Sequence, residues 1–155
     1  MKFIADAMLG KLEKRLRLLG FDVLYDAALP DNEIIMLSRE SGRTILTRDT
    51  GLASRPLAEH HLLILSDHVN EQIAQVLSAF PAPPAEEALT RCSMCNETLL
   101  PIELKDAADR IPQFIAQSKR TYLSCPVCER VYWRGTHVRR LEASGNLLHK
   151  KSRRP

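Results

Sequence analysis

The chain has 155 residues, of which 45% are hydrophobic and 26% are charged, and its formal net charge is +3. These are ordinary values for a globular protein. No apolar run approaches the ~20 residues of a membrane span, and Asp6 interrupts the first apolar run too early for the core of a signal peptide. The sequence therefore predicts a soluble, cytoplasmic protein with one medium domain or two small ones, and no membrane partner.

The charge is divided unevenly along the chain. Residues 1–80 contain nine Lys and Arg against 11 Asp and Glu, whereas residues 81–155 contain 13 against eight. An acidic half joined to a basic half fits a protein that binds a metal ion in one part and a polyanion in the other. Ordinary solvated surfaces would give the same imbalance, so the charge pattern alone does not decide the function.

The first 80 residues alternate short apolar runs with longer segments that carry apolar residues at helical spacing. The predicted strands span residues 2–5, 21–25, 44–47 and 62–65. The predicted helices span residues 8–19, 31–41, about 52–57 and 69–80. Successive strand–helix units predict an α/β fold with a parallel sheet whose faces are covered by helices.

Acidic residues follow three of the predicted strands. Asp6, Asp49 and Asp67 stand at or just past the end of an apolar run, and the carboxyl edge of a parallel sheet is where such folds bind ligands. Asp31 can cap the second helix for purely structural reasons, although the same carboxylate would be available to a metal. The pattern predicts one acidic site at this edge of the sheet.

All four cysteines belong to the second half of the chain. They form two CxxC pairs, Cys92 with Cys95 and Cys125 with Cys128. Two such turns can present four thiolates to one tetrahedral Zn²⁺. Disulfides and a redox pair are the alternatives, but neither an oxidising compartment nor a thioredoxin-like context supports them. The spacing predicts one structural zinc.

The proline-rich stretch around residues 81–87 favours an extended spacer between the two halves. The expected organisation has four parts. They are an α/β domain over residues 1–80, a linker over 81–90, a zinc ribbon over 91–145 and a basic tail over 146–155.

Two groups of cations are candidates for phosphate binding. Lys11 lies about one helical turn past Asp6, and Arg48 directly precedes Asp49. After the last cysteine pair, arginines alternate with aromatic residues, a combination that can contact phosphates and stack on unpaired bases. The arginines assigned to this contact are Arg134, Arg139 and Arg140. The aromatic residues there would equally serve to pack a small ribbon core.

Several segments, taken in order, resemble the Mut-seven C-terminal ribonuclease domain family. They are Phe3-Ile-Ala-Asp6-Ala-Met-Leu-Gly-Lys-Leu, Ile45-Leu-Thr-Arg-Asp49, the two CxxC pairs and Val131-Tyr-Trp-Arg-Gly-Thr-His137. The resemblance covers nearly the whole chain, and the ordered combination is much more specific than any single segment. It implies a PIN-like nuclease fold, with a parallel sheet flanked by helices, followed by a small zinc-ribbon module.

The resemblance also implies an activity, the metal-dependent cleavage of RNA phosphodiester bonds with the ribbon assisting RNA binding. Mg²⁺ or Mn²⁺ would be the catalytic ion, and Zn²⁺ the structural one. The acids that the resemblance assigns to the catalytic site are Asp6, Asp31, Asp49 and Asp67. For Asp31 and Asp67, neighbours such as Glu33 or Asp26 remain open alternatives.

Two other functions fit the same residues. The protein would be a non-catalytic RNA-binding adaptor if its acids were purely structural, and metal-dependent cleavage separates this function from a nuclease. It would be a toxin-like endonuclease if it required a protein partner, which nothing in the sequence indicates, and co-purification of a small inhibitor would support that function.

Overall fold

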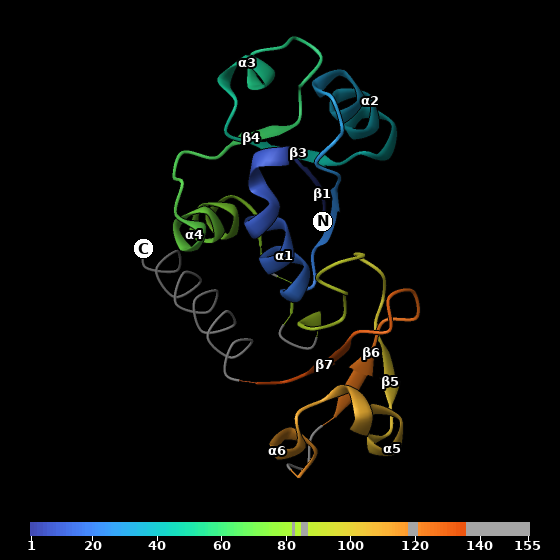
Figure 1. Cartoon of the computed structure of the whole chain (residues 1–155). Helices are drawn as coiled ribbons and strands as arrows, with labels where there is room; N and C mark the ends of the chain where they lie inside the picture. Colours follow the sequence, from blue (N-terminus) through green and yellow to red (C-terminus); the bar gives the residue numbers. More distant parts are fainter. Residues whose placement is uncertain (82, 85–86, 118–120, 136–155) are drawn as a thin grey trace.

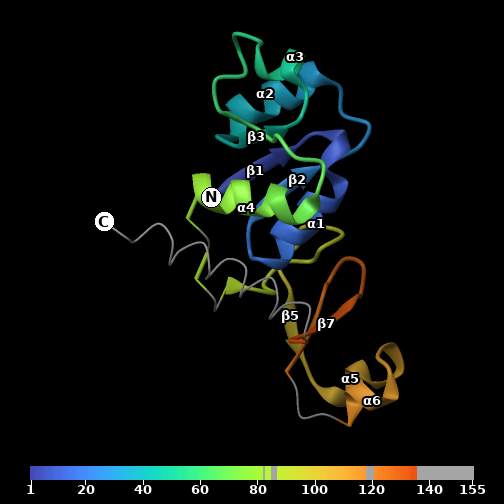
Figure 2. The same cartoon turned by 90° about the vertical axis from the view of Figure 1, so that its left-hand side faces the viewer.

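The computed structural model of the chain describes residues 1–81, 83–84, 87–117 and 121–135. Figures 1 and 2 show an α/β domain with a smaller module below it. In the first part the strands are β1 (Lys2–Ala5), β2 (Asp22–Tyr25), β3 (Thr44–Thr47) and β4 (His61–Leu63). The helices there are η1 (Ala7–Leu9), α1 (Gly10–Leu18), α2 (Asp31–Ser41), α3 (Thr50–Ala53) and α4 (Val69–Ala79).

The four strands form one sheet in the order β2-β1-β3-β4, and every pairing between them is parallel. The prediction of a parallel sheet flanked by helices is confirmed. Side chains alternate between the two faces along each strand. Phe3 and Ala5 pack with α1 and α4, whereas Ile4 between them packs with α2 and α3. The sheet is therefore buried on both faces, which explains the continuous apolar runs in its sequence.

Several boundaries differ from the sequence-based prediction by one to four residues, and two of these differences have a clear structural cause. The fourth strand ends at Leu63, because the chain then turns towards α4 and leaves the side chain of Leu65 exposed. The third helix begins at Thr50 rather than near Leu52, because Asp49 caps it with its own carboxylate. A sequence pattern locates apolar runs well, but it does not show where a side chain accepts the hydrogen bond of a backbone N–H and so starts a helix.

Two glycines have positive φ angles, and only one of them packs against a distant part of the chain. Gly20 has φ +95°, and a Cβ placed on it would lie 2.5 Å from the carbonyl oxygen of Glu87. Gly42, which ends α2, has φ +64°, and a Cβ there would meet nothing within 4 Å. A side chain in a left-handed conformation costs about 1–2 kcal/mol, and overpacking against backbone adds about 1–3 kcal/mol.

We therefore expect Gly20→Ala to lower the free energy of unfolding by more than Gly42→Ala, which serves as the matched control for φ alone. Urea denaturation of the two variants measures the difference. Equal losses would show that the chain near Glu87 does not pack against the turn at Gly20.

The second part contains a three-stranded antiparallel sheet in the order β5-β6-β7. Its elements are β5 (Leu100–Ile102), α5 (Leu104–Ala107), η3 (Ala108–Arg110), α6 (Gln113–Ala116), β6 (Tyr122–Ser124) and β7 (Val131–Trp133). Tyr122 is buried against Ile111 and Ile115, and its hydroxyl donates to the carbonyl of Ile115 at 2.9 Å. Among the described residues, no helix has both the length and the hydrophobicity needed to cross a bilayer.

Candidate active site and four-cysteine cluster

The carboxyl ends of β1 and β3 bring two of the predicted acids to one edge of the sheet. The register pairs Ala5 with Leu46, and the backbone N–H of Asp6 donates to the carbonyl of Leu46 at 3.0 Å. Asp6 therefore leaves the sheet beside Thr47, and Thr47 is two residues before Asp49 in the chain. Its side chain is mostly withdrawn from solvent, because the residue is only 8% exposed.

Thr47 links the two acids through its hydroxyl group. It is fully buried, its Oγ1 donates to Oδ2 of Asp6 at 2.6 Å, and the same oxygen accepts the backbone N–H of Asp49 at 2.9 Å. These bonds fix one oxygen of the Asp6 carboxylate and the start of the turn after β3. Sequence reasoning treated Thr47 only as a strand former, although a hydroxyl residue two positions before an acid at a strand end was a usable signal.

The carboxylate of Asp49 also has a structural task. Its Oδ1 accepts the backbone N–H of Gly51 at 2.7 Å and so caps α3. A Cβ on Gly51 would lie 3.1 Å from that oxygen, so the turn is built closely around the carboxylate. The capping bond holds the side chain in a defined orientation at the edge of the sheet.

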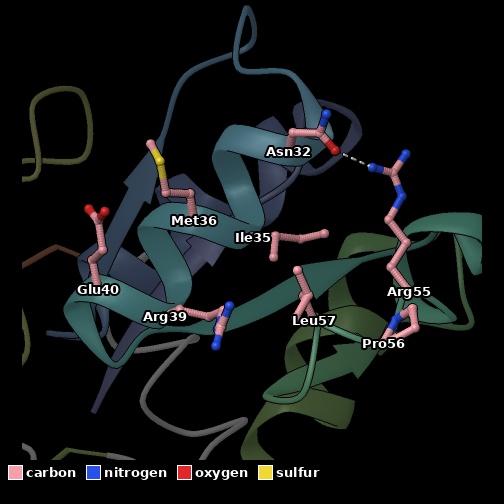
Figure 3. A pocket seen from close by; sticks show the side chains of 8 residues that line it. All are labelled: Asn32, Ile35, Met36, Arg39, Glu40, Arg55, Pro56 and Leu57. Atoms are coloured by element: carbon pink, nitrogen blue, oxygen red, sulfur yellow. Dashed lines mark hydrogen bonds between the residues drawn. The ribbon is translucent and has the colours of Figure 1, made fainter.

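Asp31 has a different environment from the one predicted. It occupies the first position inside α2, and Pro30 is the capping residue, because the extended backbone of Pro30 (ψ 156°) precedes the helix. Oδ2 of Asp31 lies 2.7 Å from Nη2 of Arg55 as an ion pair, and Arg55 also donates to Asn32 at 2.7 Å, a bond drawn in Figure 3. The carboxylate of Asp31 is thus already paired with Arg55, which lies in the loop after α3.

A cavity of about 410 Å³ lies beside this edge of the sheet. Its charged and phenolic lining residues are Lys11, Lys14, Arg48, Asp67 and Tyr25. The structure therefore brings together the two predicted cations and the fourth predicted acid. It adds Lys14 and Tyr25, neither of which was predicted from the sequence as a site residue. Three cations against one acid make the cavity suited to an anion.

Tyr25 is fixed at the rim of this cavity. Its hydroxyl donates to the carbonyl of Ala7 at 2.8 Å, and Gly10 allows this approach because a Cβ there would lie 2.7 Å from the phenolic oxygen. Burial, and then the negative charges of Glu13 and Asp6, raise the pKa of the phenol. Tyr25 therefore remains a neutral hydrogen-bonding group at physiological pH.

A larger cavity of about 670 Å³ lies between α2 and the loop after α3, as Figure 3 shows. Its lining includes the apolar side chains of Ile35, Met36 and Leu57 and the charged side chains of Arg39, Glu40 and Arg55. None of the four predicted catalytic acids lines it. The smaller, basic cavity is the better candidate for chemistry because it combines charge with the carboxyl edge of the sheet.

The four cysteines form one compact cluster. One ligand atom from each of Cys92, Cys95, Cys125 and Cys128 lies within 4.8 Å of the others, and within the described ranges this is the only group of three or more metal-binding side chains that could hold an ion. The prediction that the two CxxC turns come together is confirmed.

The two cysteine turns share one backbone pattern. In the first, the N–H of Cys92 donates to Glu97 and the N–H of Asn96 donates back to Cys92. In the second, Cys125 and the residues four and five positions later repeat both bonds. Asn96 and its counterpart Glu129 both have φ near +60°, as such tight turns require. Two equivalent turns facing one another are the arrangement that tetrahedral zinc sites use.

Hydrogen bonds favour the thiolate form of Cys92. Burial alone would raise the pKa of this thiol, but the hydroxyl of Tyr132 at 3.1 Å and the backbone N–H groups of Cys95 and Met94 lower it to about 7. Burial, and then the bond to Cys92, raise the pKa of the Tyr132 phenol to about 12. A thiolate is the form that binds a metal.

The aromatic residues after the last cysteine pair pack inside the ribbon. Tyr132 lies against Cys92 and Leu99, whereas Trp133 packs on the cluster around Tyr122. These contacts favour the packing role over base stacking. Of the arginines predicted to contact RNA, Arg134 follows β7 within the described chain, whereas Arg139, Arg140 and the tail over 146–155 lie outside the described residues.

Fold and sites together define an α/β protein with acids and cations at the carboxyl edge of a parallel sheet, followed by a module that could hold a metal ion. The family model described as the Mut7-C RNAse domain matches residues 1–144, so the chain belongs to that family. A search of the curated proteins gave no match, and neither did a search of the solved structures. Membership supports a ribonuclease-type function with RNA as the substrate.

Proposed function

We propose that the protein is a metal-dependent ribonuclease whose catalytic centre lies at the carboxyl edge of the β1–β3 pair. The observation that carries this proposal is the hydroxyl of Thr47, which binds the carboxylate of Asp6 and the backbone of Asp49 at once. The basic cavity beside them supplies a place for the phosphate backbone of RNA. Acids that hold a cation and cations that hold a phosphate are the two elements that phosphodiester hydrolysis needs.

The donor set fits a small hard cation. Mg²⁺ prefers oxygen ligands, keeps several of its waters and is usually held by one or two carboxylates together with substrate phosphates. Asp6 and Asp49 are the residues that would hold it, and Asp67 on the cavity wall is a further oxygen donor. When bound, such an ion polarises the phosphate and lowers the pKa of a water molecule.

The chain itself would contribute binding and orientation. Lys11, Lys14 and Arg48 line the cavity and would neutralise the phosphate charge that increases in the transition state. Thr47 keeps the Asp6 carboxylate in a single orientation, and the capping bond from Gly51 does the same for Asp49. Because the ion pair with Arg55 already engages Asp31, we assign Asp31 a weaker role in the site.

We further propose that the four cysteines hold one structural Zn²⁺ and that the basic module around them increases RNA affinity. The paired turns and the compact cluster support this assignment. On this proposal, residues 1–80 form the nuclease domain, residues 91–145 the zinc ribbon, and residues 81–90 the connection. Arg134, Arg139 and Arg140 remain the proposed RNA contacts of the ribbon.

The test of the function is cleavage of a labelled single-stranded RNA by the zinc-loaded protein, with added Mn²⁺ or Mg²⁺ and without either ion. We expect cleavage only with the added ion and a large loss in Asp49→Asn. Cleavage that continues unchanged in a chelator of Mg²⁺ and Mn²⁺ would contradict the proposal.

One observation favours a second function. Because Asp49 caps α3 and Asp31 pairs with Arg55, two of the predicted catalytic acids have structural tasks. In a non-catalytic RNA-binding protein, these two acids would have structural roles only. Such a protein would bind the RNA in the same assay but would leave it intact at every concentration of added ion.

The basic cavity makes a separate prediction about affinity. Replacing Lys14 and Arg48 together by Ala should weaken RNA binding and reduce the slope of log K against log salt by about 1.4, because each phosphate contact on a single strand contributes about 0.7. Filter binding or fluorescence anisotropy at several salt concentrations measures the slope.

Arg39→Ala is the matched control, because Arg39 is an exposed cation of α2 that lines the other cavity. An unchanged slope in the double variant, or an equal change in the control, would remove the basic cavity from the RNA path.

A further inference from the structure

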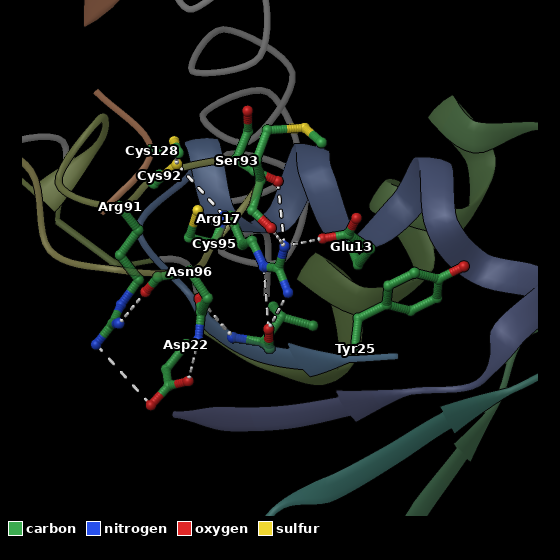
Figure 4. Close-up of polar contacts among 12 residues, drawn as sticks. Glu13, Arg17, Asp22, Tyr25, Arg91, Cys92, Ser93, Cys95, Asn96 and Cys128 are labelled. Atoms are coloured by element: carbon green, nitrogen blue, oxygen red, sulfur yellow. Dashed lines mark hydrogen bonds and ion pairs between the residues drawn. The ribbon is translucent and has the colours of Figure 1, made fainter. Parts of the chain in front are cut away.

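A buried arginine joins the α/β domain to the first cysteine turn. Arg17 in α1 is only 4% exposed, and Figure 4 shows its guanidinium between β2 and this turn. Its Nε and Nη2 donate to the carbonyl of Val23 at 3.0 and 2.8 Å. Its Nη1 donates to the carbonyls of Ser93 and Met94 at 3.1 and 2.9 Å. The two residues between Cys92 and Cys95 are therefore both held by one side chain of the other domain.

The charge of Arg17 is balanced within its own helix. Oε2 of Glu13, whose side chain is 2% exposed, lies 2.7 Å from Nη1 of Arg17. Oε2 of Glu13 makes this ion pair but no hydrogen bond among the described residues, so removing Arg17 would leave it as an uncompensated buried charge. The carbonyls of the cysteine turn are thus part of what makes this pair tolerable inside the protein.

The peptide groups that Arg17 binds are also those that face the sulfur of Cys92. The carbonyl of Met94 belongs to the same peptide group as the N–H of Cys95, which lies 3.4 Å from Sγ of Cys92. The carbonyl of Ser93 belongs to the peptide group whose N–H is that of Met94, and this N–H is also bonded to Cys92. Each peptide group is held at its oxygen by a cation and directs its N–H to the ligand atom.

A second contact fixes the residue that follows the turn. The side chain of Asn96 accepts the backbone N–H of Val23 at 3.1 Å and donates to Oδ1 of Asp22 at 2.7 Å. Arg43 binds the same carboxylate, with Nη1 at 2.8 Å from Oδ1. The first cysteine turn is therefore attached to β2 on both sides, through Arg17 and through Asn96.

We propose that Arg17 is a positioning residue of the four-cysteine metal site, and that metal binding there is coupled to the packing of α1 against β2. The guanidinium sets the orientation of the two peptide groups around Cys92, and the metal-bound turn in return supplies the acceptors that Arg17 needs. This inference rests on the proposed zinc site but not on the nuclease activity.

The first test is the zinc affinity of the full-length protein, measured by competition with a chromophoric chelator of known affinity. Arg17→Met should raise the dissociation constant for zinc about 10- to 100-fold, which is the usual effect of losing a partner behind a metal ligand. Arg15→Met is the matched control, because its side chain is on the same helix and makes no hydrogen bond or ion pair among the described residues. Its zinc affinity should equal that of the parent.

A double variant separates this effect from simple misfolding. Arg17→Met alone leaves Glu13 buried without its partner, so we pair it with Glu13→Gln, which removes the unbalanced charge. The double variant should fold and should still bind zinc about 10- to 100-fold more weakly than the parent. The parent itself gives a further readout, because chelation of its zinc should accelerate amide hydrogen exchange in α1 and β2 as well as in the cysteine turns.

The outcomes distinguish this inference from the zinc assignment. A parent that contains no zinc by elemental analysis would overturn both. A parent with one zinc, a folded double variant of unchanged zinc affinity, and unchanged exchange in α1 and β2 on chelation would overturn the coupling alone. Weakened zinc affinity in the double variant together with faster exchange in α1 would establish it.

Discussion

Removing the zinc should unfold the module that contains β5, β6 and β7. Structural zinc contributes on the order of 10 kcal/mol to the folding of small zinc-binding modules, which is more than so small a hydrophobic core can replace. The cluster around Cys92, Leu99 and Cys125 contains two of the four proposed ligands, so loss of a metal bound there would also disrupt the centre of this core. We expect Cys125→Ser to lose both zinc and the antiparallel sheet.

Circular dichroism and elemental analysis of the variant measure the two losses. Val127→Ala is the control, because Val127 lies in the same turn, is 67% exposed and is not a ligand. A Cys125→Ser protein that keeps one zinc per chain and an unchanged melting temperature would show that the cysteines are not its ligands.

The second large effect concerns catalysis. Asp6→Asn should lower the rate of RNA cleavage by about a thousandfold or more, because a bound cation supplies several kcal/mol of transition-state stabilisation and each 1.36 kcal/mol is a factor of ten. The asparagine can still accept the hydrogen bond from Thr47, so the fold should persist. Steady-state cleavage with saturating Mn²⁺ measures the rate.

Substitutions at two other residues test whether this effect is specific. Glu59→Gln removes an exposed carboxylate from the loop before β4 and should leave the rate unchanged. Thr47→Val removes the hydroxyl that positions Asp6 and should reduce the rate about 10- to 100-fold, whereas Thr47→Ser should restore it. Parental rates in both Asp6→Asn and Thr47→Val would move the active site away from this edge of the sheet.

Local patterns in the sequence predicted the order of the elements correctly. Short β-branched runs and helical spacing identified the four parallel strands and their helices, because burial on both faces imposes a continuous apolar pattern. The cysteine cluster was equally predictable, since each CxxC turn is a local structure and two such turns can share one ion. Asp6 and Asp49 were expected at one edge because parallel strands end together, and the register of β1 and β3 agrees.

The contacts that shape the sites were not predictable from local patterns. Arg55 pairs with Asp31 across 24 residues, and Arg17 reaches the carbonyl of Met94 across 77. Such contacts depend on how helices pack, which periodicity does not specify. Lys14 shows the same limit, because its position three residues after Lys11 in a predicted helix could not show that Arg48 and Tyr25 would complete a cavity there.

Asp6 and Asp49 are proposed to hold one divalent cation together. The most direct measurement is binding of Mn²⁺ to the zinc-loaded protein, followed by the electron paramagnetic resonance signal of the free ion, with and without a single-stranded oligonucleotide. We predict one bound Mn²⁺ in the parent, with affinity increased by the oligonucleotide because substrate phosphates complete the ligand shell. Asp6→Asn and Asp49→Asn should each weaken binding at least about tenfold while the zinc content stays the same. Parental Mn²⁺ affinity in both variants would contradict the account.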